Sequence, residues 1–509
     1  MNLIGSQRFL KLDTLPDSAN IVIVGGGLVG LEVAKELDHL GASGVLVLEA
    51  GPAEDLSHAN AVNDANTALR LWLNPTTDKY FWLPWTSKSE PHFSDAACLK
   101  RRLGGRSLYW HGVILPIEHW ALCEPWWPRA IIDDLIGSWR GGPSLYAQVS
   151  TDLEAWRTIG TSPSIDVPPL TIGHYKFSMT PQATRSIMSD RGQRWEAYSP
   201  VSYWSSSERN GMLRHSASSL ILSDAEVLGI KVDGGRATGV IVRSGSSSVS
   251  KEIRCNAVVL TAGTIENTRL AIQALSEVGA IKDPCLDGLV DHIAQGFVVT
   301  LDPACLSGDI ADLGAFERFY FTHCADHSRS NLFVRMLNNQ AGAFVVDVWT
   351  MGEQLPSTQG VVQCVPVEDQ PWKVFVQTSL AASDREVINA QRDELQSFWT
   401  ALCGVIDRPS SILEFLDFDA PARTLSEVLP GLESTPSGIG PITWSGPLGS
   451  EHHEGCTLPL GVLLNNAHEF VHVKSLFAGG QSTFPRVGAA NPSLTSLALA
   501  KRLAAFLPG

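Results

Sequence analysis

Three glycines and one acid near the start of the chain have the spacing of a dinucleotide-binding site. Gly25, Gly27 and Gly30 form a Gly-x-Gly-x-x-Gly loop, and Glu49 follows 19 residues after Gly30. In such a loop the first glycine permits a tight turn, the second lets the backbone approach a pyrophosphate, and the third lets a helix pack closely on a strand. An acid at this distance accepts hydrogen bonds from a ribose diol and repels a 2′-phosphate. The pattern therefore predicts FAD or NAD and disfavours NADP.

The segments around this loop predict the strand, helix and strand that would position it. Residues 21–24 read Ile-Val-Ile-Val, a run typical of a parallel strand buried on both faces. A helical pattern occupies residues 28–37, and a second apolar run, residues 45–48, ends at Glu49. The N-terminus of the helix would offer free N–H groups and a partial positive charge to phosphates. This combination is far more specific than the glycine loop alone.

Composition limits the protein class and its partners. The chain has 509 residues, a net charge of −15 and nine cysteines. Its length predicts two domains, and its acidic balance argues against nucleic acid or an anionic membrane as a partner. The cysteines are scattered and form no Cys-x-x-Cys pair, which favours reduced thiols and a cytoplasmic location. The sequence shows no secretory signal, no membrane span and no metal-binding motif, so we expect none of them.

A second glycine-rich stretch follows at residues 101–112. Gly104 and Gly105 are adjacent, Ser107 supplies a small hydroxyl, and Tyr109 and Trp110 are aromatic. This mixture suits a backbone that lies against a flat cofactor, with peptide N–H groups and a hydroxyl available to its oxygens. An ordinary turn flanked by aromatic residues is the alternative.

Two further stretches belong to the middle of the chain. Residues 257–263 form an apolar run that ends in Ala262 and Gly263 and leads into a helix start at residue 264. Asp233 and the glycines after it predict a hairpin turn between two apolar segments, the first of which contains Val227. Small residues at the end of the 257–263 strand would leave room for a dinucleotide.

The C-terminal part carries two more patterns. His452 and His453 begin a stretch that continues through Thr457 to Gly461. Farther on, Gly479 and Gly480 precede the sequence Asn-Pro-Ser-Leu-Thr at residues 491–495, which opens an apolar final helix. Proline suits a first helical turn because no N–H is needed there.

Taken together, these motifs resemble those of the glucose–methanol–choline (GMC) family of FAD oxidoreductases. The Gly-Gly-x-Ser-x-x-Trp stretch is nearest to the pyranose-oxidase branch, in which a histidine is bonded covalently to the flavin. Tyr109 stands at that histidine's position, so the resemblance implies tightly but non-covalently bound FAD, with His111 as an outside candidate for attachment. Asp291 and His292 resemble a family Asp-His pair, which we interpret as structural.

The resemblance implies an α/β fold with two parts. A Rossmann-type FAD-binding domain is expected from residues 15–140, 211–297 and 453–509, and a discontinuous substrate domain on a mostly antiparallel sheet from residues 141–210 and 298–452. The implied cofactor-binding residues are Gly25, Gly27, Leu28, Val29, Gly30, Glu49, Gly104, Gly105, Ser107, Tyr109, Trp110, Val227, Ala262, Gly263, Gly480, Asn491, Pro492, Leu494 and Thr495. In the substrate domain, residues 344–350, 360–366 and 372–378 are predicted to be strands of one sheet.

The resemblance also implies a reaction. His453 would take the hydroxyl proton of an alcohol as the carbinol hydride moves to flavin N5, and Asn491 would orient the hydroxyl. His452 remains an alternative base, because Cys456 replaces the glycine usually found before the threonine. We expect a sugar or glycoside hydroxyl as substrate, since this branch and the abundant tryptophan both point to a sugar.

Other readings stay open at the level of sequence. A sterol or aliphatic alcohol oxidase or dehydrogenase would share the same motifs. A lyase of the hydroxynitrile type would use the same fold without cycling the flavin. The sequence does not distinguish O2 from another electron acceptor, and it does not determine the oligomeric state.

Overall fold

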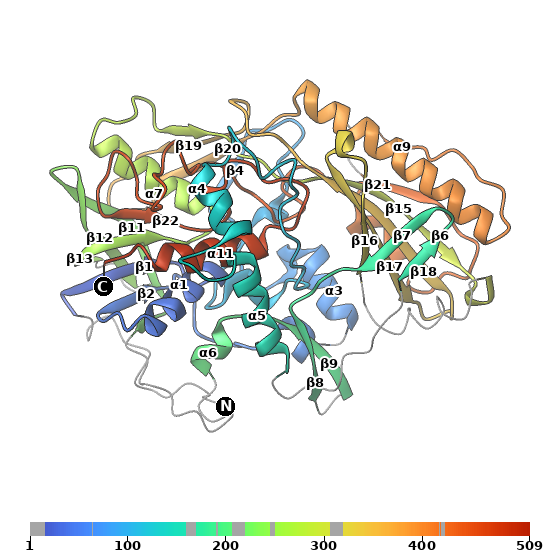
Figure 1. The fold of residues 1–509 in the computed structure, drawn as a ribbon, viewed down its shortest axis with the longest axis horizontal. Helices are drawn as coiled ribbons and strands as arrows, with labels where there is room; N and C mark the ends of the chain where they lie inside the picture. The colour runs from blue at the N-terminus through green and yellow to red at the C-terminus, as the bar shows by residue number, and fades with distance from the viewer. Residues whose placement is uncertain are drawn as a thin grey trace.

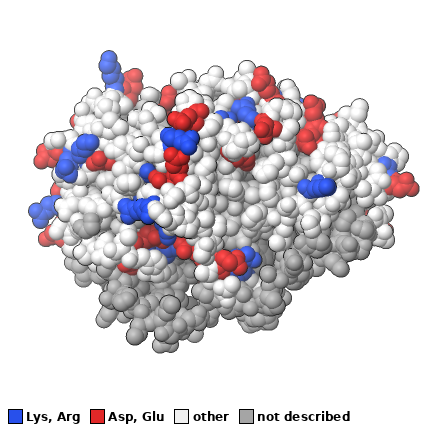
Figure 2. Space-filling model, in the orientation of Figure 1, with Lys and Arg blue, Asp and Glu red and all other residues white. Residues whose placement is uncertain are grey.

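The computed structural model describes residues 16–63, 65–158, 169–189, 192–205, 219–244, 250–305, 319–416, 418 and 423–508. Within these residues the chain forms two large sheets that lie side by side, with helices covering their outer faces (Figure 1). The predicted α/β class is confirmed. On the face shown in Figure 2, acidic and basic side chains are interspersed, and no extended area is basic.

The first sheet is mostly parallel and contains the predicted strand, helix and strand. Its order is β10-β2-β1-β13-β12-β11, and β22 pairs with β13. The strands are β1 (Ser18–Val24), β2 (Val45–Leu48), β10 (Leu220–Leu222), β11 (Ala225–Asp233), β12 (Arg236–Ser244), β13 (Ser250–Leu260) and β22 (Leu476–Ala478). As predicted, residues 21–24 are buried in a parallel strand, and the structure places β1 between two parallel neighbours, β2 and β13. The predicted hairpin at Asp233 is also confirmed, because β11 and β12 are antiparallel.

Helices cover both faces of this sheet. Among the described residues the α-helices are α1 (Leu28–His39), α2 (Ala59–Val62), α3 (Ala65–Leu73), α4 (Arg129–Ile132), α5 (Leu145–Thr158), α6 (Val201–Ser205), α7 (Thr264–Glu277), α9 (Ala382–Val405), α10 (Leu425–Val428) and α11 (Ser493–Ala504). On one face α1 and α11 pack together, with Leu31, Ala34 and Leu503 in a shared apolar core (Figure 1). On the other face α7 packs against β11. These contacts fix the N-termini of α1, α7 and α11 near the carboxyl ends of the parallel strands.

The second sheet is antiparallel and carries the longest helix. Its order is β21-β15-β18-β17-β16-β7-β6. The strands are β6 (Leu170–Ile172), β7 (Tyr175–Met179), β15 (Ile293–Leu301), β16 (Phe319–His323), β17 (Ser330–Asn338), β18 (Phe344–Gly352) and β21 (Ile442–Ser445). Helix α9 runs along its outer face, and Phe398 and Trp399 are fully buried against strand residues such as Phe297 (Figure 1). The predicted boundary at residue 297 falls inside β15, which belongs wholly to this sheet.

One prediction about the second sheet is wrong. Residues 344–350 lie in β18, but the other two predicted strands, β19 (Val361–Val365) and β20 (Lys373–Gln377), form a separate sheet with β14 (Cys285–Asp287) and β4 (Trp85–Ser87). Their hairpin is held by β14 on one side and by β4, from far earlier in the chain, on the other. Sheet membership here depends on long-range partners, which the local pattern does not contain.

Smaller elements complete the fold. Two short hairpins are formed by β3 (Phe81–Trp82) with β5 (Leu99–Lys100), and by β8 (Thr184–Ser189) with β9 (Gly192–Ala197). All nine cysteines are free thiols. In the part of the chain that the structure describes, no helix combines the length and apolarity needed to cross a bilayer, and no cluster of side chains has the composition of a metal site.

Candidate active site

A cavity of about 1210 Å³ is lined by residues of both large sheets. Its lining includes the carboxyl ends of β1, β2 and β13, and also residues of β16, β17 and β18. The N-terminal ends of α1, α7 and α11 contribute as well. Ligands of open α/β sheets bind at the carboxyl ends of the strands, so this cavity is the natural place for a dinucleotide and a second molecule.

The glycine loop has the geometry that its spacing predicted. Gly25 has a φ of +103°, and a Cβ atom there would lie 2.7 Å from Ala262 Cα. A Cβ on Gly30 would lie 1.9 Å from the carbonyl oxygen of Gly25, so only glycine lets α1 pack against this turn. Gly27 differs, because a Cβ there would meet nothing within 4 Å. The loop therefore leaves open space in front of Gly27, where a pyrophosphate would approach.

Glu49 lies at the end of β2, buried in the cavity wall. Its Oε2 accepts a hydrogen bond from the Gly26 amide at 2.9 Å, and its Oε1 accepts one from the Gly51 amide at 2.7 Å. Each carboxylate oxygen retains a second lone pair for a ligand hydroxyl. Burial raises the pKa of Glu49 from 4.5 to about 7, and the two amide hydrogen bonds oppose this rise.

This pKa gives a testable pH dependence. A carboxyl whose pKa is raised by folding contributes stability that is full below its unfolded pKa and is lost as pH rises through its folded pKa. We expect the stability of the flavin-free wild type, relative to Glu49→Gln, to fall by about 3 kcal/mol between roughly pH 4.5 and 7, and then to level off. Thermal or urea unfolding of both proteins across this range would measure it. A difference that does not change with pH would contradict the assignment.

The second glycine stretch closes over the first. Gly104 has a φ of +90°, its amide donates to the Gly26 carbonyl at 2.8 Å, and a short 3-10 helix, η4 (Gly105–Leu108), follows. A Cβ on Gly105 would lie 3.6 Å from Gly27 Cα. The Ser107 hydroxyl donates to the Gly104 carbonyl and pairs with Ser199 Oγ, both at 2.7 Å. This hydroxyl already has partners within the protein.

Tyr109 and His111 occupy different environments. Tyr109 does not line the cavity; its hydroxyl accepts a hydrogen bond from Arg102 at 3.1 Å, and Lys100 lies over its ring. His111 does line the cavity, between the rings of Trp72 and Phe319. Burial lowers the pKa of His111 to about 3. The side chain at the position of the family's covalent histidine is therefore turned away from the cavity.

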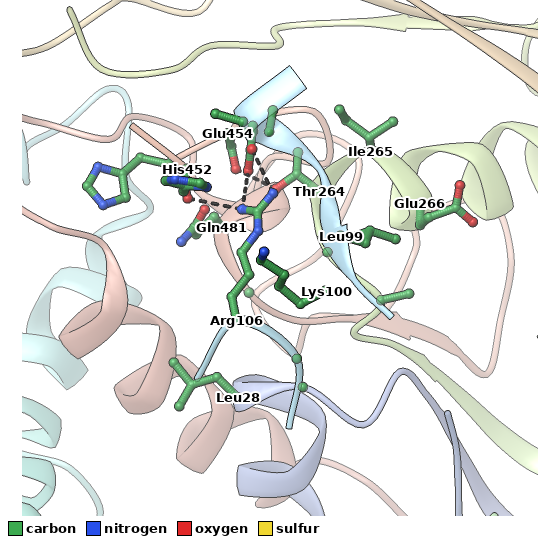
Figure 3. Close-up of a pocket in the computed structure, with 18 of the residues that line it drawn as sticks. Leu28, Leu99, Lys100, Arg106, Thr264, Ile265, Glu266, His452, Glu454 and Gln481 are labelled. Carbon is green, nitrogen blue, oxygen red and sulfur yellow. Dashed lines mark hydrogen bonds and ion pairs between the residues drawn. The ribbon is translucent and has the colours of Figure 1, made fainter. Parts of the chain in front are cut away.

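Arg106 ties the second glycine stretch to the histidine segment. Its guanidinium makes a bidentate ion pair with Glu454, at 2.8 and 2.9 Å, and also donates to the carbonyls of Cys98 and His452 (Figure 3). Burial lowers the pKa of Arg106, but the charge and hydrogen bonds of Glu454 raise it by more, so the net pKa is raised. Bidentate charged pairs of this kind are geometrically specific. The pair fixes the backbone on one side of His453.

His453 and Asn491 meet in this cavity, although 38 residues separate them in the sequence. Asn491 Nδ2 lies 3.4 Å from His453 Nε2, and both residues line the cavity. The Asn491 Oδ1 atom is buried and has no hydrogen-bond partner among the described residues. Burial lowers the pKa of His453 well below its ordinary value, so its imidazole is neutral at neutral pH. A neutral imidazole and an unpartnered amide oxygen together suit a hydroxyl group as ligand.

His452, the alternative base, also lines the cavity but lies elsewhere. Its ring packs against Trp72 at 4.6 Å between centroids, and its carbonyl accepts a hydrogen bond from Arg106 (Figure 3). Its φ of +60° places it in the left-handed region. This backbone turn directs the two neighbouring imidazoles to different parts of the cavity, and only that of His453 contacts Asn491.

The segment around His453 is anchored on its other side by Asp291. The Asp291 carboxylate accepts hydrogen bonds from the amides of Glu451 and His453, at 3.1 and 3.0 Å. Burial, together with Glu454 and Glu451, raises the pKa of Asp291 to about 8. The next residue, His292, places its Nδ1 at 2.7 Å from His453 Nδ1.

The wall from the second sheet is aromatic but contains buried charges. Trp349 stacks on Phe333, with ring centroids 5.2 Å apart, and Phe333 packs in a cluster with Ala490, next to Asn491. Arg335 pairs with Asp347 at 2.8 Å, and both are buried. Burial raises the pKa of Asp347 despite the opposing effect of Arg335. This part of the cavity therefore offers both flat apolar faces and polar groups to a ligand.

The predicted site residues fall into two groups. Those that line the cavity are Gly25, Gly27, Leu28, Val29, Glu49, Gly105, Ser107, Trp110, Val227, Ala262, Gly263, Gly480, His453 and Asn491. Those that do not are Gly30, Gly104, Tyr109, Pro492, Leu494 and Thr495. Pro492 is the N-cap of α11 rather than part of its first turn, and Leu494 and Thr495 are buried in the core.

Sequence reasoning missed several residues of this site. Arg106 lies inside the glycine-rich stretch at residues 101–112, but no pattern in the sequence marks Glu454 as its partner. Arg335 and Asp347 lie in strands without a motif, and only the pairing of β17 with β18 sets them opposite each other. From the sequence we interpret His292 as structural, and the structure adds that its Nδ1 contacts His453.

Comparison with solved structures identifies the fold. No protein-family model matches the chain, and no curated protein does. A solved structure, described as pyridoxine 4-oxidase from Mesorbium loti, is similar with a TM-score of 0.58 and 16% sequence identity. The match covers 96% of this chain and 99% of that one. It lends no weight to the narrower resemblance to pyranose oxidases. The chain therefore has the fold of the GMC oxidoreductases.

Proposed function

We propose that this protein is an FAD-dependent enzyme that oxidises an alcohol to a carbonyl compound. The observation that carries the proposal is the meeting of His453 and Asn491 in the same cavity as the glycine loop and Glu49. The fold of the pyridoxine 4-oxidase structure supports it, since that protein is by name an oxidase.

The residues present fit FAD. The space in front of Gly27 is open, while the glycines on either side are tightly packed, as expected of a cradle for a pyrophosphate. Glu49 is held by two backbone amides with lone pairs left for ribose hydroxyls. Gly27, Gly105 and Glu49 would hold the dinucleotide. Because Tyr109 is turned away from the cavity, we propose that FAD is bound non-covalently.

Two protein groups would act on the alcohol, one by accepting its proton and the other by orienting its hydroxyl. When bound, FAD supplies the hydride acceptor. His453 Nε2 would take the hydroxyl proton, and Asn491 would hold the hydroxyl oxygen in place by donating a hydrogen bond from Nδ2. O2 or another acceptor would receive the electrons afterwards.

The walls of the cavity favour a polar, ring-bearing alcohol. Arg335 and Asp347 are buried beside the stacked rings of Phe333 and Trp349. A ring face can stack on the aromatic side chains while ring hydroxyls reach the charged pair. We propose a sugar or glycoside hydroxyl as the substrate, and not a sterol, which would leave these polar groups unmatched.

A second candidate is a hydroxymethyl group on an aromatic ring. The stacked pair of Phe333 and Trp349 suits a planar ring as well as a sugar, and the similar structure is named for pyridoxine. The same wall would then hold the ring, and Arg335 or Asp347 would contact its polar substituents.

Anaerobic mixing with a panel of alcohols tests the proposal. The panel contains D-glucose, methyl β-D-glucoside, pyridoxine, benzyl alcohol and cholesterol, and the absorbance of the bound flavin is followed. We expect a polar ring compound to bleach the flavin. Bleaching by cholesterol alone would favour the sterol alternative, whereas a flavin that no alcohol bleaches would favour the lyase. Protein that binds no FAD would refute the proposal.

A further inference from the structure

We propose that His292 is a positioning residue that fixes the tautomer of His453, so that the Nε2 atom facing the substrate carries no hydrogen. This inference rests on the proposed function, because it concerns how the base is held ready. The chain of contacts runs from the Gly488 carbonyl through His292 to His453 and ends at Asn491.

The first link determines which nitrogen of His292 carries hydrogen. His292 Nε2 lies 2.9 Å from the carbonyl oxygen of Gly488. A carbonyl oxygen can only accept, so Nε2 must be the donor and carry the hydrogen. His292 is buried, and burial lowers its pKa to about 4, so its ring is neutral. Its Nδ1 therefore has a lone pair and no hydrogen.

The second link transfers this constraint to His453. The two Nδ1 atoms lie 2.7 Å apart, which is hydrogen-bonding distance. Since Nδ1 of His292 can only accept, Nδ1 of His453 must donate. A neutral imidazole carries one hydrogen, so Nε2 of His453 is left with its lone pair. In the other tautomer of His453 two lone pairs would face each other at this distance.

The third link is the end of the chain at the cavity. Asn491 Nδ2 lies 3.4 Å from His453 Nε2, and an amide N–H can only donate. The Asn491 N–H is therefore compatible with a lone pair on His453 Nε2, and not with a hydrogen on that atom. The unpartnered Asn491 Oδ1 then remains available to the alcohol.

The Gly488 carbonyl, at which this series of hydrogen bonds begins, is itself rigidly held. The Gly488 amide donates to Glu353, and Glu353 forms a bidentate pair with Arg486, at 2.8 and 2.7 Å. Glu353 is fully buried, and the neighbouring Ala489 amide donates to Glu118. The carbonyl that sets the tautomer of His292 is thus fixed by a network outside the cavity.

Matched variants of His292 separate this role from a packing role. In His292→Asn, Oδ1 can occupy the place of Nδ1 and still accept from His453. In His292→Leu, a side chain of similar size offers no acceptor. If the Leu variant fails to fold, His292→Gln replaces it, because its amide can still donate to Gly488 while leaving the Nδ1 position empty. FAD content and melting temperature show whether each variant is folded.

The direct readout is 15N NMR of histidine-labelled holoprotein without substrate, with the His453 signals identified by comparison with His453→Gln. We expect hydrogen on Nδ1 and none on Nε2 in wild type and His292→Asn, and a shift toward hydrogen on Nε2 in His292→Leu. Hydrogen on Nε2 of wild-type His453, or an unchanged tautomer in His292→Leu, would overturn the assignment.

Flavin reduction by the alcohols named above supplies the second readout. We expect the limiting rate constant at saturating alcohol to fall about 100-fold in His292→Leu and to recover in His292→Asn, with little change in the alcohol's dissociation constant. Equal losses in the two variants would indicate packing alone and overturn the inference. If the tautomers are as expected but no alcohol reduces the wild-type flavin, the proposed function fails while the assignment of His292 stands.

Discussion

Replacing His453 by alanine is expected to leave a folded, yellow protein whose flavin is reduced by alcohol about 10³-fold more slowly. The side chain of His453 contacts Asn491 and His292, and the residues proposed to hold FAD, such as Gly27 and Glu49, lie elsewhere in the chain. Loss of a general base typically costs between about 10² and 10⁴ in rate. Anaerobic stopped-flow absorbance measures the effect, and the ratio of flavin to protein absorbance shows that FAD is still bound.

His452→Ala is the matched control for this prediction. The two histidines are neighbours, both line the cavity, and burial lowers the pKa of both. His452 packs against Trp72 and does not contact Asn491. We therefore expect a much smaller loss in His452→Ala. Unchanged flavin reduction in His453→Ala, with a large loss in His452→Ala, would transfer the role of base to His452.

Replacing Gly27 by valine is expected to give a folded but colourless protein. Gly27 precedes α1 with a φ of −84°, which any residue adopts, and its Cβ would enter open space. The substitution should therefore cost little stability in the flavin-free protein. The added side chain would fill the space in front of the loop where the pyrophosphate is proposed to lie, so we expect FAD affinity to fall at least about 100-fold. Titration of the flavin-free protein with FAD measures it.

Substitutions at two other glycines serve as controls for this result. Gly137→Val adds the same side chain at an exposed position with open space, and we expect normal FAD binding. Gly30→Ala would place a methyl group 1.9 Å from the Gly25 carbonyl, and we expect loss of stability rather than selective loss of FAD. If Gly27→Val binds FAD as tightly as the wild type, the dinucleotide does not lie along this loop.

The first sheet could be predicted from the sequence because its information is local. The β-branched run at residues 21–24, the glycine loop and the acid at residue 49 specify a strand, a turn and a helix through short-range sterics. The structure forms these elements where the sequence predicts them, and it places β1 between β2 and β13. Gly25 and Gly30 are required at their positions by contacts within the loop or with the end of the adjacent strand, so the local pattern of strand, loop, helix and acid indicates the unit.

The second and third sheets could not be predicted to the same depth. Residues 361–365 and 373–377 were recognised as strands, but their partners, β4 and β14, lie far away in the sequence. An alternating pattern tells which face of a strand is buried and not which strand lies beside it. The same limit hid the ion pair of Arg335 and Asp347, which faces the cavity only because β17 and β18 pair in one register.

The sequence by itself determined the dinucleotide loop, the class of the fold, and the two side chains, His453 and Asn491, on which the proposed chemistry depends. Only the tertiary structure decided how they are used. It turned Tyr109 away from the cavity, separated His453 from His452 by a left-handed turn, and placed His292 against His453. The type of a residue and its spacing along the chain carry its chemical capacity. Its hydrogen-bond partners can come from other segments of the chain, as His292 and Asn491 do for His453, and those partners fix its orientation and its proton.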